Sequence, residues 1–219
     1  MNAHTVRRPG AARSLRDNGP VSTDHYFSAD PGVPVRHTDV EFSVAGRDYR
    51  LVAASGVFSA GRLDPGTAVL LKKATRPAGG TLLDLGCGYG PIACVLATEV
   101  PDATVYAIDV NARARELAAR NAETLDVPVT VCAPEEVPPD VTFTEIWSNP
   151  PTHIGKAGLH ALLERWLARL DPDGVAWLVI NRHLGGDSLH AWLTGAGWAV
   201  TRVASQKGFR VLKVQRKIG

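Results

Sequence analysis

Alternating glycines follow an apolar run near the middle of the chain, in the segment LLDLGCGYG at residues 82–90. We predict a strand that ends in this turn and continues into a helix over residues 91–98. Such a turn brings its backbone close to a ligand, because a side chain at Gly86, Gly88 or Gly90 would block the approach. Free N–H groups at the start of the helix then face that ligand. Dehydrogenases use a similar turn, and some such turns bind nothing, so other residues must identify the ligand.

Two acidic residues narrow the choice of ligand. Asp84 lies two residues before Gly86, where a carboxylate suits a ligand with an ammonium group better than one with a pyrophosphate. Asp109 ends the next apolar run and is placed to accept hydrogen bonds from ribose hydroxyls. The alternative for Asp109 is to cap the following helix, a role that Asn111 fills equally well. A ligand with an amino-acid end and a nucleoside end is S-adenosylmethionine, which we therefore expect as the cofactor.

An amide and two prolines, Asn149-Pro150-Pro151, follow the fourth predicted strand of the same series. Parallel strands end at one edge of a sheet, so this segment is expected beside the glycine turn. The prolines fix two φ angles and hold the Asn149 amide and the nearby carbonyls in a preset direction. An amide oxygen and a carbonyl both accept hydrogen bonds from an –NH₂ group and leave its lone pair able to attack a methyl donor. The pattern predicts that these three residues are catalytic and act on a planar amine; the alternative is a plain loop at a strand end.

The surrounding elements belong to the α/β class. Residues 38–54 alternate apolar and polar side chains around a Gly46-Arg47 turn, which predicts a β-hairpin. Short β-rich runs then alternate with helical stretches, as in βαβ units with a parallel sheet. These strands are expected at residues 81–85, 104–108, 129–132, 143–148 and 175–180. Two further strands, 198–204 and 209–215, are separated by a loop too short for a crossover helix, so they must be antiparallel neighbours.

A helix is predicted after Gly155, because apolar residues recur there with helical spacing. These residues are Leu159, Leu162, Leu163, Trp166, Leu167 and Leu170. The following Asp171-Pro172-Asp173-Gly174 is expected to break the helix. The whole pattern predicts a doubly wound, Rossmann-like, seven-stranded and mostly parallel sheet with an antiparallel last strand, preceded by the N-terminal hairpin.

Composition fits one soluble catalytic domain. The chain has 219 residues, of which 45% are hydrophobic and 21% charged, with a net charge of +2. It contains no apolar stretch of the roughly 20 residues that a membrane span needs, so a cytoplasmic protein is expected. Residues 1–22 carry scattered arginines without the apolar segment of a secretory signal, and we expect a flexible basic tail. The three cysteines form no CxxC pair, and the histidines lack metal-ligand spacing, so neither disulfides nor a metal is expected.

With these motifs in place, the chain resembles the class I S-adenosylmethionine-dependent methyltransferases with an Asn-Pro-Pro motif. More narrowly, it resembles the small-subunit ribosomal RNA guanine-N2 methyltransferases. The shared segments include Tyr26-Phe27-Ser28, Ser55-Gly56-Val57-Phe58-Ser59, Asp64-Pro65-Gly66-Thr67 and Lys207-Gly208-Phe209-Arg210-Val211-Leu212-Lys213. The resemblance implies methylation of the exocyclic N2 amine of a guanine in ribosomal RNA, with RNA or the small ribosomal subunit as the partner.

The resemblance also implies an organisation and further site residues. Residues 23–219 are expected to form one methyltransferase domain, with the hairpin at 38–54, a connecting loop and helix at 55–80, and the catalytic core at 81–217. In that family the segment with Gly56, Phe58 and Ser59 lies over the cofactor, so these residues become cofactor-binding candidates.

Two departures from the family pattern bear on the substrate and on adenine. Family members commonly have an aromatic residue after Asn-Pro-Pro that can stack on a flipped base. Here Thr152 and His153 follow and are taken as substrate-binding candidates, so stacking must come from elsewhere or the substrate differs. The third strand ends in Ala133 where many relatives have an acid that accepts the adenine amine, so backbone groups or Glu135 would have to do so.

Two other functions stay open. A protein glutamine amide presents the same planar –NH₂ group, so a glutamine N-methyltransferase fits the same motif. A catalytically silent RNA-binding or assembly factor could retain the fold, although the intact glycines, Asp109 and Asn-Pro-Pro argue against it.

Overall fold

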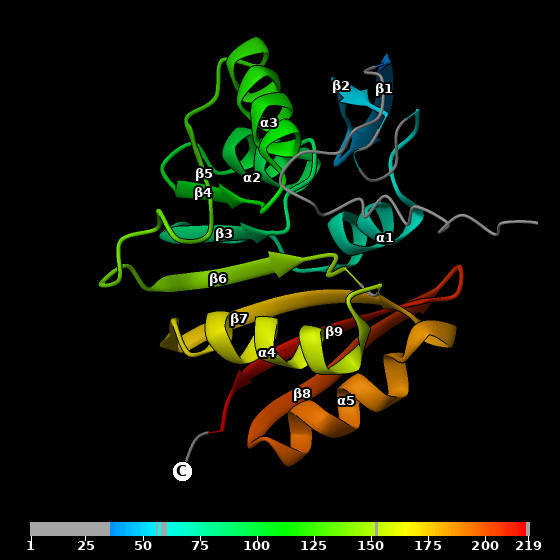
Figure 1. Ribbon diagram of the computed structural model, residues 1–219, viewed down its shortest axis with the longest axis vertical. Coiled ribbons are helices and arrows are strands. Elements are labelled where there is room, and N and C mark those ends of the chain that lie inside the picture. The colour runs from blue at the N-terminus through cyan, green and yellow to red at the C-terminus, as the bar shows by residue number, and fades with distance from the viewer. Residues whose placement is uncertain (1–35, 56, 58–60, 152, 218–219) are drawn as a thin grey trace, which may run out of the picture.

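A seven-stranded sheet forms the centre of the protein in a computed structural model that describes residues 36–217, except residues 56, 58–60 and 152 (Figure 1). The predicted tail and the candidates Gly56, Phe58, Ser59 and Thr152 therefore lie outside the described residues. The strands are β3 (Thr81–Leu85), β4 (Thr104–Ile108), β5 (Val129–Cys132), β6 (Phe143–Ser148), β7 (Leu170–Asn181), β8 (Trp198–Gln206) and β9 (Phe209–Arg216). They lie in the order β5-β4-β3-β6-β7-β9-β8.

Strand directions confirm the predicted α/β fold. Neighbouring strands from β5 to β7 are parallel, and β9 lies between β7 and β8 and runs antiparallel to both. The expected pairing of the last two strands is thus confirmed. The insertion of β9 also makes β8 run in the same direction as the parallel strands.

The start of β7 differs from the prediction. The helix after Gly155 ends at Leu167, and Leu170 is the first residue of β7 instead of the last apolar residue of the helix. Leu170 is buried and pairs with Phe143, and the register then shifts before Glu145 pairs with Val175. This irregularity accommodates the Asp171–Gly174 segment within the strand, so the segment does not form a separate loop.

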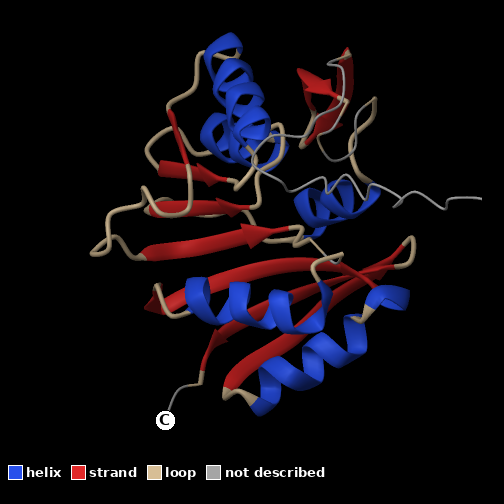
Figure 2. Cartoon of the chain, in the orientation of Figure 1, coloured by secondary structure: helices blue, strands red, loops and turns tan. Residues whose placement is uncertain are grey.

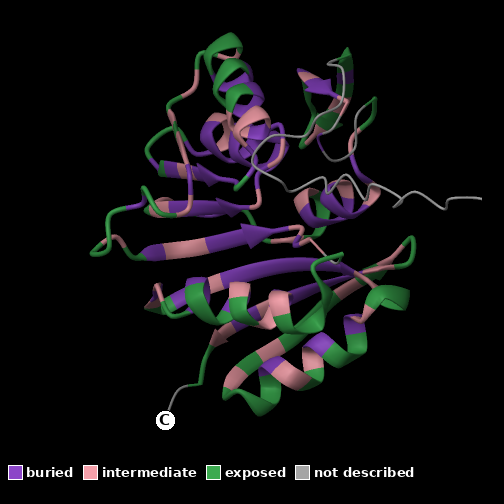
Figure 3. Cartoon of the chain, viewed as in Figure 1, coloured by how far each residue is buried: buried purple, intermediate pink, exposed green. Residues whose placement is uncertain are grey.

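Helices cover both faces of the sheet (Figure 2). They are α1 (Pro65–Lys73), α2 (Pro91–Glu99), α3 (Ala112–Thr124), α4 (Gly155–Leu167) and α5 (Gly186–Gly195), with a short 3₁₀ turn η1 (Arg182–Leu184). Side chains of α1 and α2 share a core with Leu82, whereas those of α4 and α5 share another with Leu83. Consecutive residues of β3 therefore face opposite layers, as the period of a strand requires. The central strands are buried in consequence (Figure 3).

The N-terminal hairpin is confirmed and packs on α3. It consists of β1 (His37–Val44) and β2 (Arg47–Ala54), and its turn residues are Ala45 and Gly46 instead of the predicted Gly46 and Arg47. Both turn residues have positive φ, of 51° and 81°, as expected for a two-residue hairpin that matches the twist of its strands.

The hairpin is attached by an apolar cluster and one buried amide. Leu51 packs in a cluster with Leu117 of α3. The Asn121 side chain of α3 accepts a hydrogen bond from Val52 N at 2.8 Å and donates to Val52 O at 2.9 Å and to Tyr89 O at 2.8 Å. One side chain thus joins the hairpin to the glycine turn. Within the described ranges, no helix has the length and apolar character to span a membrane.

Candidate active site

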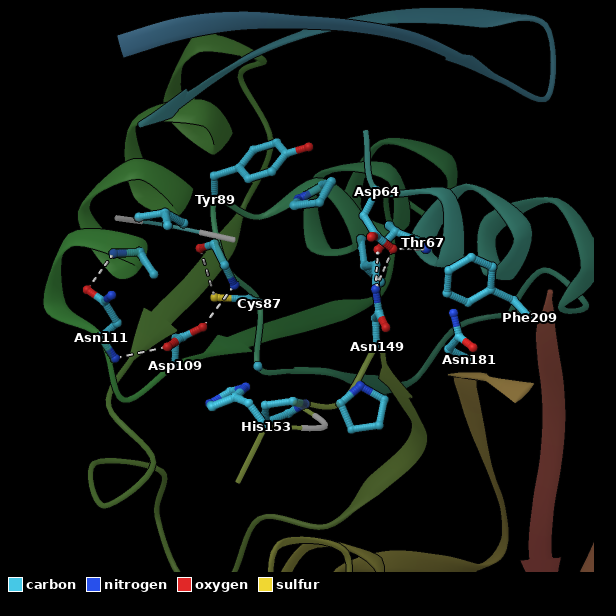
Figure 4. Close-up of a pocket in the computed structure, with 18 of the residues that line it drawn as sticks. Asp64, Thr67, Cys87, Tyr89, Asp109, Asn111, Asn149, His153, Asn181 and Phe209 are labelled. Atoms are coloured by element: carbon cyan, nitrogen blue, oxygen red, sulfur yellow. Dashed lines mark hydrogen bonds between the residues drawn. The ribbon is translucent and has the colours of Figure 1, made fainter. Parts of the chain in front are cut away.

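A cavity of about 270 Å³ opens at the carboxyl ends of β3, β4 and β6 (Figure 4). Ligands of open α/β sheets bind at this edge, where the strand order reverses between β3 and β6. Of the sequence candidates, the lining includes Gly86, Gly88, Asp109, Asn149, Pro150, Pro151 and His153. Other lining residues include Asp64, Thr67, Tyr89, Asn111, Asn181, Leu184 and Phe209.

The glycine turn presents open backbone to this cavity. Among the described residues, a Cβ on Gly88 would meet no atom within 4 Å, and a Cβ on Gly86 would meet only Pro151 Cδ, at 4.0 Å. Gly90 instead serves packing, because its φ is 85° and a Cβ there would lie 3.0 Å from the Cβ of Ala118. Gly86 and Gly88 therefore leave room for a ligand, whereas Gly90 allows α2 to pack closely on α3.

Asp109 supports the glycine turn and is not the cap of α3. Its Oδ2 accepts from Gly88 N at 2.9 Å, and its Oδ1 accepts from Asn111 N at 2.9 Å. Asn111 caps α3 by accepting from Arg113 N and Ala114 N, which is the role that the sequence left open between the two residues. Burial raises the pKa of Asp109, and the two backbone N–H groups oppose that shift. A carboxylate anchored in this way keeps a fixed position at the wall of the cavity.

Asp84 lies behind the cavity instead of in its wall. It is fully buried, and its Oδ2 accepts from Ala93 N in the first turn of α2 at 2.9 Å. Its Oδ1 has no hydrogen-bond partner among the described residues. Burial raises the pKa of Asp84 to about 8, with a smaller contribution from the Asp109 charge. A buried carboxyl in this state gains from a positive charge nearby, so the site fits a cationic ligand.

Asn149 is oriented by a residue that the sequence did not identify as functional. Its Nδ2 donates to Asp64 Oδ2 at 2.7 Å and to Thr67 Oγ1 at 3.1 Å. Because an ionised carboxylate only accepts hydrogen bonds, the nitrogen of the amide must face Asp64. The Oδ1 of Asn149 then remains as an acceptor at the cavity wall.

Asp64 itself is fixed by the start of α1. The same Oδ2 accepts from Thr67 N at 2.9 Å, which makes Asp64 the N-cap of α1. Pro65 occupies the first helical position, where its missing N–H costs nothing. An acidic residue followed by proline is a recognisable helix start in the sequence, but nothing local indicates that the helix faces Asn149.

The remaining cavity residues include His153, which follows the Asn-Pro-Pro segment, and residues of η1 and β9. Ser148 Oγ donates to Leu85 O at 2.7 Å and ties the Asn-Pro-Pro segment to the end of β3. His153 is exposed at the cavity. Leu184 and Phe209 line the cavity from distant parts of the chain, and Leu184 is 61% exposed. The sequence offered no signal for Leu184, whereas Phe209 lies in a segment already quoted for its resemblance.

The sheet order, the glycine turn after β3 and the acid at the end of β4 define a class I methyltransferase fold. The model of the methyltransferase small domain family matches residues 48–213, and the chain belongs to this family. It is an S-adenosylmethionine-dependent methyltransferase, as the residues at the two strand ends predicted.

Several known proteins are similar to the chain. An uncharacterised protein of Bacillus subtilis, YbxB, is 33% identical over 199 residues, which cover 89% of this chain and 99% of that protein. Ribosomal RNA small subunit methyltransferase C of Hahella chejuensis is 42% identical over 142 residues, which cover 62% of this chain and 41% of that protein.

A similar solved structure is the 16S rRNA N2 G1207 methyltransferase (RsmC) of T. thermophilus in complex with AdoMet and guanosine. It has a TM-score of 0.71 and 26% identity, and the match covers 85% of this chain and 52% of that one. The chain thus spans nearly all of YbxB and about half of the ribosomal RNA methyltransferases it matches.

Proposed function

We propose that this methyltransferase transfers a methyl group to the exocyclic N2 amine of a guanine in small-subunit ribosomal RNA. The observation that carries the proposal is the orientation of Asn149, whose Nδ2 is held by Asp64 at 2.7 Å while its oxygen stays available as an acceptor. An acceptor fixed in this way favours a group that donates N–H, such as –NH₂, and disfavours a carbonyl oxygen, which has no hydrogen to donate.

The cofactor half of the site rests on the glycine turn and the two acids. The open backbone of Gly86 and Gly88 takes the adenosyl ligand, and Asp109 accepts from the ribose hydroxyls at the end of β4. Asp84 lies behind the turn, and a positive charge at the amino-acid end of the ligand would lower its raised pKa and favour its charged form. S-adenosylmethionine supplies an activated methyl group on a sulfonium.

The residues that contact the substrate amine act by orienting it toward the methyl donor. Asn149 Oδ1 and the Pro150 carbonyl accept the two N–H groups of the amine, so its lone pair points along the direction of transfer. A new N–C bond forms as the methyl group leaves sulfur, and the amine then loses one proton. That proton leaves to solvent at the open side of the cavity, where His153 is exposed. A strong base is not required, because the methyl donor is already activated.

Similarity supports the choice of ribosomal RNA. The RsmC relative is named for the N2 position of a guanine in 16S rRNA, and its structure holds AdoMet and guanosine. The region matched by the methyltransferase small domain model, residues 48–213, contains both the glycine turn and the Asn-Pro-Pro segment.

Mass spectrometry of nucleosides tests the proposal. Small-subunit ribosomal RNA from a strain that lacks the gene should lack one N2-methylguanosine that reappears on complementation. Purified protein with S-adenosylmethionine should restore the same nucleoside in vitro. Unchanged RNA together with a hypomethylated glutamine in a release factor would instead support the protein amide as the substrate.

A further inference from the structure

A second hollow, of about 240 Å³, lies beside the cavity, between η1 and the hairpin of β8 and β9. Phe209 lines both hollows. The second hollow is otherwise lined by Arg182, Arg202, Ser205, Gln206, Lys207, Gly208 and Arg210. Four of these eight residues are cationic and none is acidic. The hollow is therefore strongly basic, although the whole chain has a net charge of only +2.

Most of this positive charge is accessible. Arg182, Arg202 and Lys207 are exposed, whereas Arg210 is buried and forms an ion pair with Asp187. Arg182 also contacts the ring nitrogen Nε2 of its neighbour His183 at 3.3 Å. Asp187 pairs with Arg210, and no ion pair among the described residues involves Arg182, Arg202 or Lys207, so these three cations present their charge to solvent.

A bulge in β8 determines the direction of the Arg202 side chain. A bulge near Val203 inserts one residue into β8, so that Arg202 pairs with Leu212 while Ser205 pairs with Arg210. Leu212 and Arg210 lie two residues apart on one face of β9, and the bulge therefore turns Arg202 to the face of Arg210. Without the extra residue, Arg202 would point to the opposite face.

The turn of the same hairpin fixes the other two cations. Lys207 and Gly208 have positive φ, of 50° and 80°, and form a two-residue turn. Arg182 N donates to Gly208 O at 2.8 Å, so η1 is bound to this turn. The three exposed cations are thus held beside Phe209 by backbone geometry.

We propose that this hollow binds a backbone phosphate of the RNA substrate, next to the nucleotide whose base enters the cavity. A nucleotide carries its base and its phosphate at opposite ends of one ribose, which suits two hollows that share a wall at Phe209. Arginine and lysine are the usual partners of phosphate oxygens, and such contacts set position without reading sequence. The inference rests on the proposed function, because it takes RNA as the substrate.

The double variant Arg202→Gln/Lys207→Asn tests the site, since both side chains are exposed and asparagine tolerates the positive φ of residue 207. The control is Arg120→Gln/Lys217→Gln, which removes two exposed charges, one from α3 and one from the residue that follows β9. Binding of a short fluorescein-labelled single-stranded RNA is measured by anisotropy at several salt concentrations.

The slope of log affinity against log salt should fall by about 0.7 for each contact removed, whereas the control should keep the wild-type slope. KM for ribosomal RNA should rise in the double variant at unchanged kcat and unchanged S-adenosylmethionine affinity. A wild-type slope and KM in the double variant would overturn the phosphate site and leave the proposed function standing. Wild-type protein that binds S-adenosylmethionine but methylates no ribosomal RNA would overturn both.

Discussion

The side-chain nitrogen of Asn149 lies 2.7 Å from Oδ2 of Asp64, a residue 85 positions earlier in the chain. The contact joins the loop after β6 to the first turn of α1 and decides which end of the amide faces the cavity. A helix cap therefore also positions the residue that we propose to recognise the amine.

Replacing Asn149 with alanine should remove methyl transfer without removing the cofactor site. We expect kcat to fall by about 10²–10³-fold, as for the loss of one preorganised polar contact to the reacting group. S-adenosylmethionine affinity, measured by calorimetry, should change by less than about twofold, because the glycine turn and Asp109 are untouched. Full activity in this variant would contradict the proposed role of Asn149.

Two substitutions at Asp64 separate its capping role from its positioning role. Asp64→Ala should lower the free energy of unfolding by about 1 kcal/mol, because Thr67 N loses its cap. Asp64→Ser should keep the cap, since serine is an equally good N-cap, but its side chain is too short to hold Asn149. Both variants should therefore lose activity, while only Asp64→Ala loses stability. Denaturant unfolding and steady-state kinetics check this split, and an active Asp64→Ser variant would show that the bond to Asp64 is not needed to orient Asn149.

Asp84 should make stability fall as the pH rises. Its pKa of about 8 in the folded state lies above its ordinary value of 3.8. The contribution of Asp84 to the free energy of unfolding is therefore fully present below pH 3.8 and is lost as the pH rises through the pKa of the folded state. In Asp84→Asn, an amide oxygen can still accept from Ala93 N, and no charge forms. The difference in free energy of unfolding, Asp84→Asn minus wild type, should therefore increase between about pH 4 and pH 8. Parallel pH profiles of the two proteins would show that the carboxyl ionises as easily in the folded state as in the unfolded one.

Asn121→Ala should loosen the hairpin and the glycine turn together. It leaves three backbone groups unsatisfied, those of Val52 N, Val52 O and Tyr89 O, at a cost on the order of 3 kcal/mol. Thr124→Ala on the same helix is the control, because Thr124 is exposed and bonds only locally, to Arg120 O, so its effect should stay within about 0.5 kcal/mol. Hydrogen exchange should show faster exchange in β2 only in Asn121→Ala, and protection equal to wild type would refute the linkage.

The sequence predicted most of the fold because the strands carry their own patterns. The bounds of β3 to β6 coincide with the predicted ranges, since each run is apolar and ends at a clear turn or loop. The start of β7 was missed because Leu170 continues the helical spacing of α4 in the sequence, and burial in the sheet decides its place.

Only part of the candidate site could be predicted in the same way. Asp109 and Asn149 stand at strand ends, where topology alone brings them to one edge. Asp84 stands near such an end too, but the side chain turns to the helix start behind the cavity. Asp64, Leu184 and Phe209 join the cavity through long-range packing, which no local spacing encodes.

The amide of Asn121 imitates the peptide group of a neighbouring strand. Val52 points its N–H and C=O away from β1, and the side chain satisfies both, as a third strand would. A free strand edge is a template for pairing with other chains, and an isolated two-stranded ribbon is barely stable in water. At this position of β2, a single residue of a helix takes up the backbone N–H and C=O of the strand edge, so neither group is left to pair with another chain.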